Sequence, residues 1–202
     1  MARCYFELGD YNTSIKEYES CLEKAGNSSL ESYSLLGIAQ SHEKLTKEAE
    51  AIKICDEIIE KYPDSDAVPE AYYIKTRLFF KAARYKDAEE IAREAIGKFP
   101  SSGYLDDLHY ELGWIYTKQD RFREAVAEFA WVEKNSKDMT LSANSLCRIG
   151  DIRFDNREYD KAVESYDIVL DKYSDTPLAD YAQYQIGNIF MLQERCDQAI
   201  LA

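Results

Sequence analysis

The chain of 202 residues is 46% hydrophobic and 31% charged, a composition typical of a soluble helical protein. Its formal net charge of −13 disfavours nucleic acid and anionic membrane surfaces as partners, because little here could neutralise a row of phosphates. Only four prolines and eight glycines are present, which argues against long linkers.

The five cysteines are an odd number and form no C-x-x-C pair, so the sequence predicts neither a disulfide framework nor a zinc site. Most fall at helical positions that other segments fill with apolar residues, which indicates small buried side chains. Free thiols weakly favour a reducing compartment such as the cytoplasm. No apolar run approaches the roughly 18 residues of a membrane span, so we expect no direct membrane insertion.

In chain order, the sequence predicts consecutive helical hairpins. Residues 1–25 hold the end of one helix, a turn at Gly9 and a second helix. Gly26 begins a stop signal before two helices at 30–44 and 46–61, where Thr46 is positioned to cap the second of them. Lys61-Tyr62-Pro63-Asp64-Ser65 then marks a seam, since proline cannot continue a helix.

The same pattern of paired helices recurs further along the chain. We expect further helix pairs at 69–82 with 84–98, at 105–118 with 121–133, and at 142–156 with 158–173, followed by a last helix at 178–193 whose partner begins at 196. Lys98-Phe99-Pro100 repeats the proline seam. Met1 and Ala202 both fall inside expected helices, and neither end shows a polar cap, so we expect each end to expose apolar surface.

A fixed period of 37 residues organises these hairpins. One column contains only small residues, as helices need where they touch closely: Ser14, Ala51, Ala88, Ala125, Ala162 and Ala199. Within the central hairpin, Leu112-Gly113-x-x-Tyr116 is followed by Ala125-x-x-x-Phe129. This pattern resembles the tetratricopeptide repeat (TPR).

The resemblance implies an all-α fold, a right-handed α-solenoid (superhelix) of TPR helix hairpins, and a single array over residues 1–202. Its expected units are partial repeats at 1–28 and 180–202 and complete repeats at 32–65, 69–102, 106–139 and 143–176. The 37-residue period and the seams, with Lys172–Gly187 (KYSDTPLADYAQYQIG) closest, are similar to those of bacterial cell-envelope TPR proteins: the Tol–Pal-associated coordinator and the outer-membrane assembly lipoprotein BamD. That similarity implies a periplasmic or envelope location.

Candidate chemistry is sparse. His42 and His109 occupy packing columns and have no metal partner at ligand spacing. Paired acids such as Asp106-Asp107 lie at a helix start, where they suit the helix dipole. No glycine-rich phosphate loop is present. We therefore predict no catalytic residues, no metal and no cofactor, and a protein that is not an enzyme.

The resemblance instead implies a concave groove lined by the first helix of each hairpin. At the groove-facing offsets the sequence places mostly aromatic residues and arginines, the types enriched at binding hot spots. Trp114 is the strongest candidate, being large and central. The predicted partner-binding residues are Tyr33, Gln40, Tyr73, Arg77, Phe80, Tyr110, Trp114, Arg148, Phe154, Tyr181, Tyr184 and Asn188.

The sequence thus predicts a non-catalytic scaffold that binds a protein or peptide segment in its groove, in keeping with helix-in-groove recognition and with envelope assembly. Two alternatives stay open at this point. The chain could be a structural module that stacks end to end as a homo-oligomer through its uncapped ends, or a regulatory segment of a larger enzyme or receptor.

Overall fold

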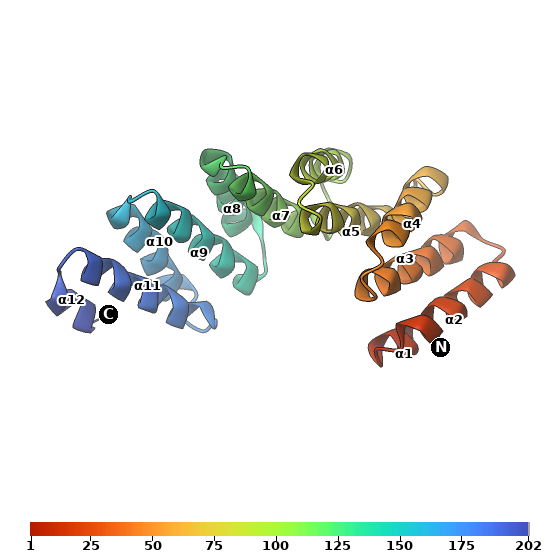
Figure 1. The fold of residues 1–202 in the computed structure, drawn as a ribbon, viewed down its shortest axis with the longest axis horizontal. Coiled ribbons are helices and arrows are strands. Elements are labelled where there is room, and N and C mark those ends of the chain that lie inside the picture. The colour runs from red at the N-terminus through yellow and green to blue at the C-terminus, as the bar shows by residue number, and fades with distance from the viewer. Residues whose placement is uncertain (202) are drawn as a thin grey trace. The chain divides into compact units, whose positions relative to one another are not determined.

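The computed structural model describes residues 1–201, apart from the side chains of residues 28, 200 and 201. All regular structure in this range is helical (Figure 1). The helices are α1 (Ala2–Glu7), α2 (Tyr11–Lys24), α3 (Ser28–Lys44), α4 (Glu48–Lys61), α5 (Val68–Lys81), α6 (Tyr85–Lys98), α7 (Leu105–Lys118), α8 (Phe122–Asn135), α9 (Met139–Asp155), α10 (Tyr159–Lys172), α11 (Leu178–Leu192) and α12 (Cys196–Leu201).

The chain divides within α7 into two compact units, Met1–Glu111 and Leu112–Ala202, which are described separately below as the N-terminal and C-terminal units. Inside each unit, consecutive helices pack on one another. The first helix of a hairpin also contacts the first helix of the next hairpin, as α1 does α3, α3 does α5, and α9 does α11. Each of these first helices therefore packs against two others, the second helix of its own hairpin and the first helix of the adjacent hairpin.

The predicted small-residue column is confirmed where the two helices of a hairpin meet. Ala51 and Ala88 in the N-terminal unit, and Ala125 and Ala162 in the C-terminal unit, are completely buried. Small residues on the opposite helix allow the same close approach. At Gly150, an added methyl group would lie only 2.5 Å from the ring of Tyr166. The spacing of the column is thus set by direct contact between helices.

The hairpin turns repeat with the same period and rarely use glycine. Positive φ values occur at Gly9, Thr46, Ala83, Asp120, Arg157 and Glu194, each 37 residues from the next. In each turn the following amide donates across six residues, as Lys47 N does to the His42 carbonyl, which satisfies a carbonyl at the end of the first helix. The expectation that Thr46 caps α4 is wrong: its hydroxyl donates to the Leu45 carbonyl, and α4 has no side-chain cap. Thr46 adopts a left-handed backbone conformation one residue before the N-cap position of α4, which Lys47 occupies.

The seams between hairpins use side chains to satisfy the next helix start. Ser65 Oγ accepts a hydrogen bond from Ala67 N, and Ser102 Oγ accepts one from Tyr104 N. The seam without proline is also well capped, because Asp138 accepts from the amides of Thr140 and Leu141. Each first helix therefore starts at a defined residue, which determines where its exposed side chains lie.

Candidate functional site

In the N-terminal unit, the predicted groove positions on α5 form a charged aromatic cluster. The guanidinium carbon of Arg77 lies 5.3 Å from the centroid of the Tyr73 ring, and that ring stacks on Tyr104 at 5.4 Å. Arg77 Nη2 also pairs with Glu43 Oε1 at 2.9 Å. We call Glu43, Tyr73, Arg77 and Tyr104 the Arg77 cluster. It joins α3, α5 and the residue before α7 on one face of the unit.

Burial controls the charge of this cluster. It raises the pKa of the Tyr73 phenol, already neutral at physiological pH, from its ordinary value to about 12. Burial also raises the pKa of Glu111, and the nearby Arg77 partly offsets that rise. Glu43 has only 8% of its side chain exposed and faces two cations, Arg77 and Lys81. The arginine is therefore held in place by an ion pair that water reaches poorly.

The C-terminal unit carries a second and more extensive arrangement. The Arg148 guanidinium lies 5.5 Å from the Trp114 ring centroid and 5.4 Å from that of Tyr181. Its Nη1 pairs with Asp151 Oδ2 at 2.9 Å. The other carboxylate oxygen of Asp151 accepts hydrogen bonds from the hydroxyls of Tyr166 and Tyr181, each at 2.7 Å. We call Trp114, Arg148, Asp151, Tyr166 and Tyr181 the Arg148 cluster.

The Arg148 cluster is a platform whose rotamers are locked. Trp114 meets the buried Phe129 edge to face at 6.0 Å, so its ring is anchored in the core while part of it stays accessible. Arg148 Nε is buried and makes no hydrogen bond within the described residues. Because these contacts already fix the rings and the guanidinium, the cluster would lose little side-chain entropy on contact with another molecule. These are physical properties of a binding surface.

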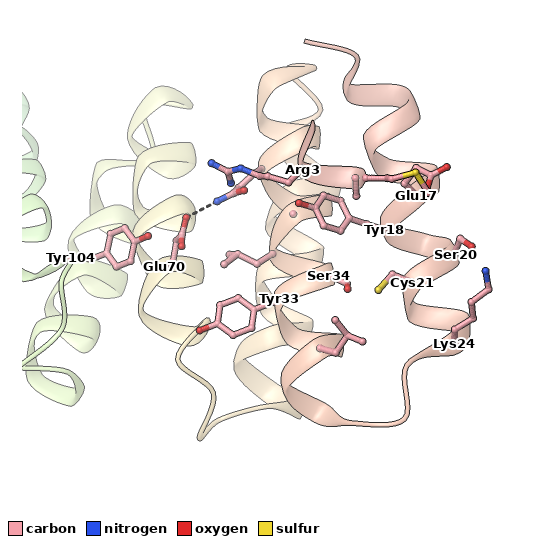
Figure 2. A pocket seen from close by; sticks show the side chains of 16 residues that line it. Arg3, Glu17, Tyr18, Ser20, Cys21, Lys24, Tyr33, Ser34, Glu70 and Tyr104 are labelled. Carbon is pink, nitrogen blue, oxygen red and sulfur yellow. Dashed lines mark hydrogen bonds between the residues drawn. The ribbon is translucent and has the colours of Figure 1, made fainter. Parts of the chain in front are cut away.

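Five more of the predicted residues lie outside the two clusters. Tyr33 and Gln40 line a cavity of about 820 Å³ in the N-terminal unit, and Gln40 Nε2 donates to Glu70 Oε1 there at 2.5 Å (Figure 2). Tyr184 and Asn188 line a smaller cavity of about 380 Å³ on α11. Tyr184 is 67% exposed and is among the most accessible rings of the chain. Tyr110 on α7 is half-buried.

The structure places two other predicted groove residues at hairpin turns. Phe80 packs on Tyr85 with ring centroids 5.6 Å apart, and Phe154 packs on Tyr159 at 5.7 Å. Each pair links the last turn of a first helix to the start of the second helix. Because these rings already lock the turns, we leave Phe80 and Phe154 out of the binding surface proposed below.

Sequence reasoning missed two members of the Arg77 cluster. Glu43 occupies the same position in its repeat as Phe80, so the repeat register contained the signal, but its residue type did not suggest a hot spot. Tyr104 lies in the seam before α7, outside the offsets counted along first helices. Its hydroxyl has a raised pKa, first through burial and then through a hydrogen bond to Glu70.

Two of the five cysteines, Cys55 and Cys147, are buried in the packing between helices. Burial raises the pKa values of the Cys55 and Cys147 thiols to about 12, which disfavours the nucleophilic thiolate at neutral pH. Burial lowers the pKa of His42. Within residues 1–201 there is no group of three or more side chains placed to hold a metal ion. None of the helices described is both long enough and apolar enough to cross a bilayer.

Comparisons with known proteins agree with this architecture. Two family models described as "Tetratricopeptide repeat" match residues 1–28 with 33–65 and residues 147–202, together more than half of the chain. A search of the curated proteins finds no match. The chain is thus a tetratricopeptide repeat protein. Such repeats generally mediate protein–protein interaction, and their proteins are generally non-catalytic scaffolds.

Solved structures support the fold. The crystal structure of MamA has a TM-score of 0.71 at 19% identity, covering 87% of this chain and 95% of that one. BtubC (BKLC) from P. vanneervenii gives 0.77 at 12% identity, with 96% and 85% covered. The apo form of RapI gives 0.79 at 15% identity, with 94% of this chain but 56% of RapI covered. These likenesses establish the predicted all-α solenoid of helix hairpins. The resemblance of the seams to those of envelope proteins stays a prediction from the sequence.

Proposed function

We propose that this chain is a protein-interaction module that binds a segment of a partner polypeptide on its first-helix face. The observation that carries this proposal is the Arg148 cluster. Trp114 and Tyr181 flank an arginine that is oriented by Asp151, and the two tyrosine hydroxyls fix that carboxylate in turn. Tryptophan, tyrosine and arginine are the residue types that dominate the energy of protein interfaces.

The accessible side-chain groups of the Arg148 cluster indicate which chemical groups the partner segment would carry. The accessible parts of Trp114 and Tyr181 favour an apolar or aromatic anchor on the partner. The Arg148 side chain is 23% exposed, and its guanidinium has more N–H donors than the ion pair with Asp151 uses, which favours a carbonyl or carboxylate beside it. Exposed Tyr184, three residues further along α11, extends this surface within the same unit. A short helical or extended segment supplies both kinds of group.

A crosslinking experiment tests this assignment. A photoreactive phenylalanine analogue replaces Tyr184, and in a matched protein it replaces Ile168, which is exposed on the second helix α10. Crosslinks in extracts of the source cells should form from position 184 and not from position 168. Equal yields from both positions would exclude a preferred first-helix face.

The partner so identified is then titrated with purified variants. Arg148→Lys keeps the charge but loses the planar group between the two rings, so we expect affinity to fall by at least about tenfold. Arg93→Lys on α6, where Arg93 is 62% exposed, serves as the control and should bind as the wild type does. Unchanged affinity in Arg148→Lys would contradict the role of the cluster.

A second candidate function rests on a separate observation. The α11 face also exposes Met191 and Leu192, at 60% and 61%, large apolar side chains that a second copy could cover. End-to-end stacking of copies would then be concentration-dependent in analytical ultracentrifugation, and Met191→Glu would abolish it. A monomer at all concentrations would leave only the first function.

A further inference from the structure

The turn between α9 and α10 departs from the side-chain pattern of three other hairpin turns. In those three, an arginine just before the second helix covers an aromatic ring in the last turn of the first helix. The pairs are Arg84 with Phe79, Arg121 with Tyr116, and Arg195 with Phe190. Their guanidinium carbons lie between 4.2 and 4.5 Å from the ring centroids, so each turn is closed by a cation–π contact.

At the turn between α9 and α10 the two kinds of residue are exchanged. Arg153 stands one repeat period after Tyr116, in the aromatic column, and Glu158 stands in the arginine column. Arg153 Nη1 donates to the Lys161 carbonyl at 3.0 Å and to Ser165 Oγ at 2.7 Å, so the guanidinium is held against α10. Its Nε and Nη2 atoms form no hydrogen bond or ion pair within the described residues. The exchange therefore leaves a fixed cation with donors to spare.

A cavity of about 260 Å³ opens beside this arginine, between the starts of α8 and α10 and the end of α9. Its polar lining is Arg123, Arg153, Asn156, Glu158 and Lys161. Arg123 is exposed and has no ion pair in the part of the chain that the structure describes, whereas Lys161 pairs with Glu158 at 2.6 Å. Three cations against one carboxylate give a surplus of two positive charges, in a chain whose formal net charge is −13. The cavity is a local basic site on an acidic protein.

The backbone adds to this positive potential. Helices α8 and α10 begin beside the cavity, and neither has a side-chain cap that would engage its first amides. The partial positive charge of a helix start favours an anion, and its N–H groups can donate to one. At the end of α9, the carbonyls of Arg153 and Phe154 already accept from Glu158 N and Arg157 N, each at 2.8 Å. The negative end of α9 is thus partly neutralised within the turn.

The arrangement of the donors indicates the class of anion. A planar carboxylate carries one charge, and a single arginine satisfies it with two parallel hydrogen bonds. Here the cations come from three helices, which suits the tetrahedral oxygens and the charge near −2 of a phosphoryl group. Phe122, Val126 and Ile152 form an apolar wall beside them. An ester with an organic substituent would cover that wall, whereas inorganic phosphate would leave it in water.

We propose that this cavity binds a phosphate monoester. The phosphoryl oxygens accept hydrogen bonds from Arg153, which is already fixed, and from Arg123 and Lys161, which close on the anion from α8 and α10. The organic substituent lies against Phe122 and Val126. None of the lining residues belongs to the Arg148 cluster, so the site is independent of the function proposed above. A phosphorylated side chain of another protein and a phosphorylated metabolite share this chemistry.

Titration of the ¹⁵N-labelled protein with phenyl phosphate at pH 7.5 and constant ionic strength tests the site. The amide resonances of residues 122–126 and 156–161 should shift together and saturate, with a dissociation constant of about 1 mM or below. Phenyl sulfate has the same ring and a tetrahedral group with only one charge, and it should bind at least about fivefold more weakly. Inorganic phosphate lacks the ring and should bind at least about threefold more weakly.

Matched variants separate the site from the general charge of the turn. Arg123→Gln should weaken binding of phenyl phosphate at least about fivefold, and it removes no contact within the described residues. Arg157→Gln makes the same charge change at an exposed position of the same turn outside the cavity, and should change affinity less than about twofold.

Two further variants change the exchanged residues themselves. Arg153→Phe restores the ring that the other turns carry, so the protein should fold with an unchanged or higher melting temperature and lose the saturable shifts. Glu158→Gln removes the carboxylate from the lining and should tighten binding about twofold or more. A gain of affinity in one variant and a loss in the other cannot both come from partial unfolding.

The source of the ester is read from two more probes. A pentapeptide with a central phosphotyrosine between glycines and glucose 6-phosphate are titrated in the same way, and the tighter of the two assigns the ligand to a modified protein or to a metabolite. The proposal is overturned if phenyl phosphate does not saturate, if phenyl sulfate binds equally well, or if Arg123→Gln and Arg157→Gln have equal affinity.

Discussion

The first and fifth hairpins place residues of the same type at matching repeat positions, but the two hairpins bury these residues to different extents. Tyr166 on α10 is completely buried under α9, and its hydroxyl donates to Asp151. Tyr18, at the same position of α2, is part-buried and rests against Gly37 of the next first helix, where an added methyl group could not fit. Burial at this position thus depends on the side chains that surround the ring and not on the tyrosine itself. How much a side chain at a given repeat position contributes to stability is therefore set by the residues around it.

The largest expected difference in stability is between the alanine substitutions of Tyr166 and Tyr18. Tyr166→Ala should reduce the free energy of unfolding by about 3–5 kcal/mol, because it empties a closed core and leaves Asp151 short of a donor. Tyr18→Ala should cost only about 1–2 kcal/mol, since its ring already borders open space. Urea unfolding followed by far-UV circular dichroism measures both. Equal losses would mean that Tyr18 is as closely packed in solution as Tyr166.

One helical turn earlier, the equivalent residues of the first and fifth hairpins are buried to the same extent. Ser14 and Ala162 share a column and are completely buried, Ser14 where α2 meets α1 and Ala162 where α10 meets α9. Ser14→Leu and Ala162→Leu should therefore both cost about 1–3 kcal/mol through overpacking. Ala130→Leu, at an exposed position of α8, is the control and should change stability by less than about 0.5 kcal/mol. A tolerated Ser14→Leu would show that the contact between α1 and α2 is loosely packed in solution.

The glycine column repeats the comparison within the C-terminal unit. A methyl group at Gly150 would collide with Tyr166, whereas the nearest atom at Gly187 is the Ala199 carbonyl oxygen at 3.9 Å. Gly150→Ala should thus destabilise the protein by about 1–2 kcal/mol. Gly187→Ala should be neutral or stabilise it by up to about 1 kcal/mol through helix propensity. Thermal melting of both variants is the measurement, and shifts of the same sign would contradict the packing described here.

The smallest expected effect concerns the turns of the same two hairpins. Gly9 has a φ of 80° and Arg157, at the matching position, has a φ of 62°. Arg157→Gly should stabilise the protein by up to about 1 kcal/mol, because glycine adopts this backbone without strain, and Gly9→Ala should destabilise it by a similar amount. Chemical denaturation resolves changes of this size. A destabilising Arg157→Gly would mean that the arginine side chain stabilises its turn by more than the strain it carries.

The sequence by itself determined the regular part of this protein. The small-residue column predicted the buried contacts of Ala125 and Ala162, and periodicity predicted helix α7 at its observed bounds, Leu105–Lys118. Both signals succeed because a helix contact is governed by residues three or four apart and by a column that recurs every 37 residues. Local spacing suffices to predict which face of each helix is buried.

Only the tertiary structure decided which exposed residues act together. Phe80 and Trp114 are both aromatic residues at groove offsets, yet Phe80 locks a turn against Tyr85 while Trp114 flanks Arg148. The Arg148 cluster joins side chains from α7, α9, α10 and α11. Such contacts depend on distances between helices that are remote in the chain, and no periodicity within one helix encodes those distances.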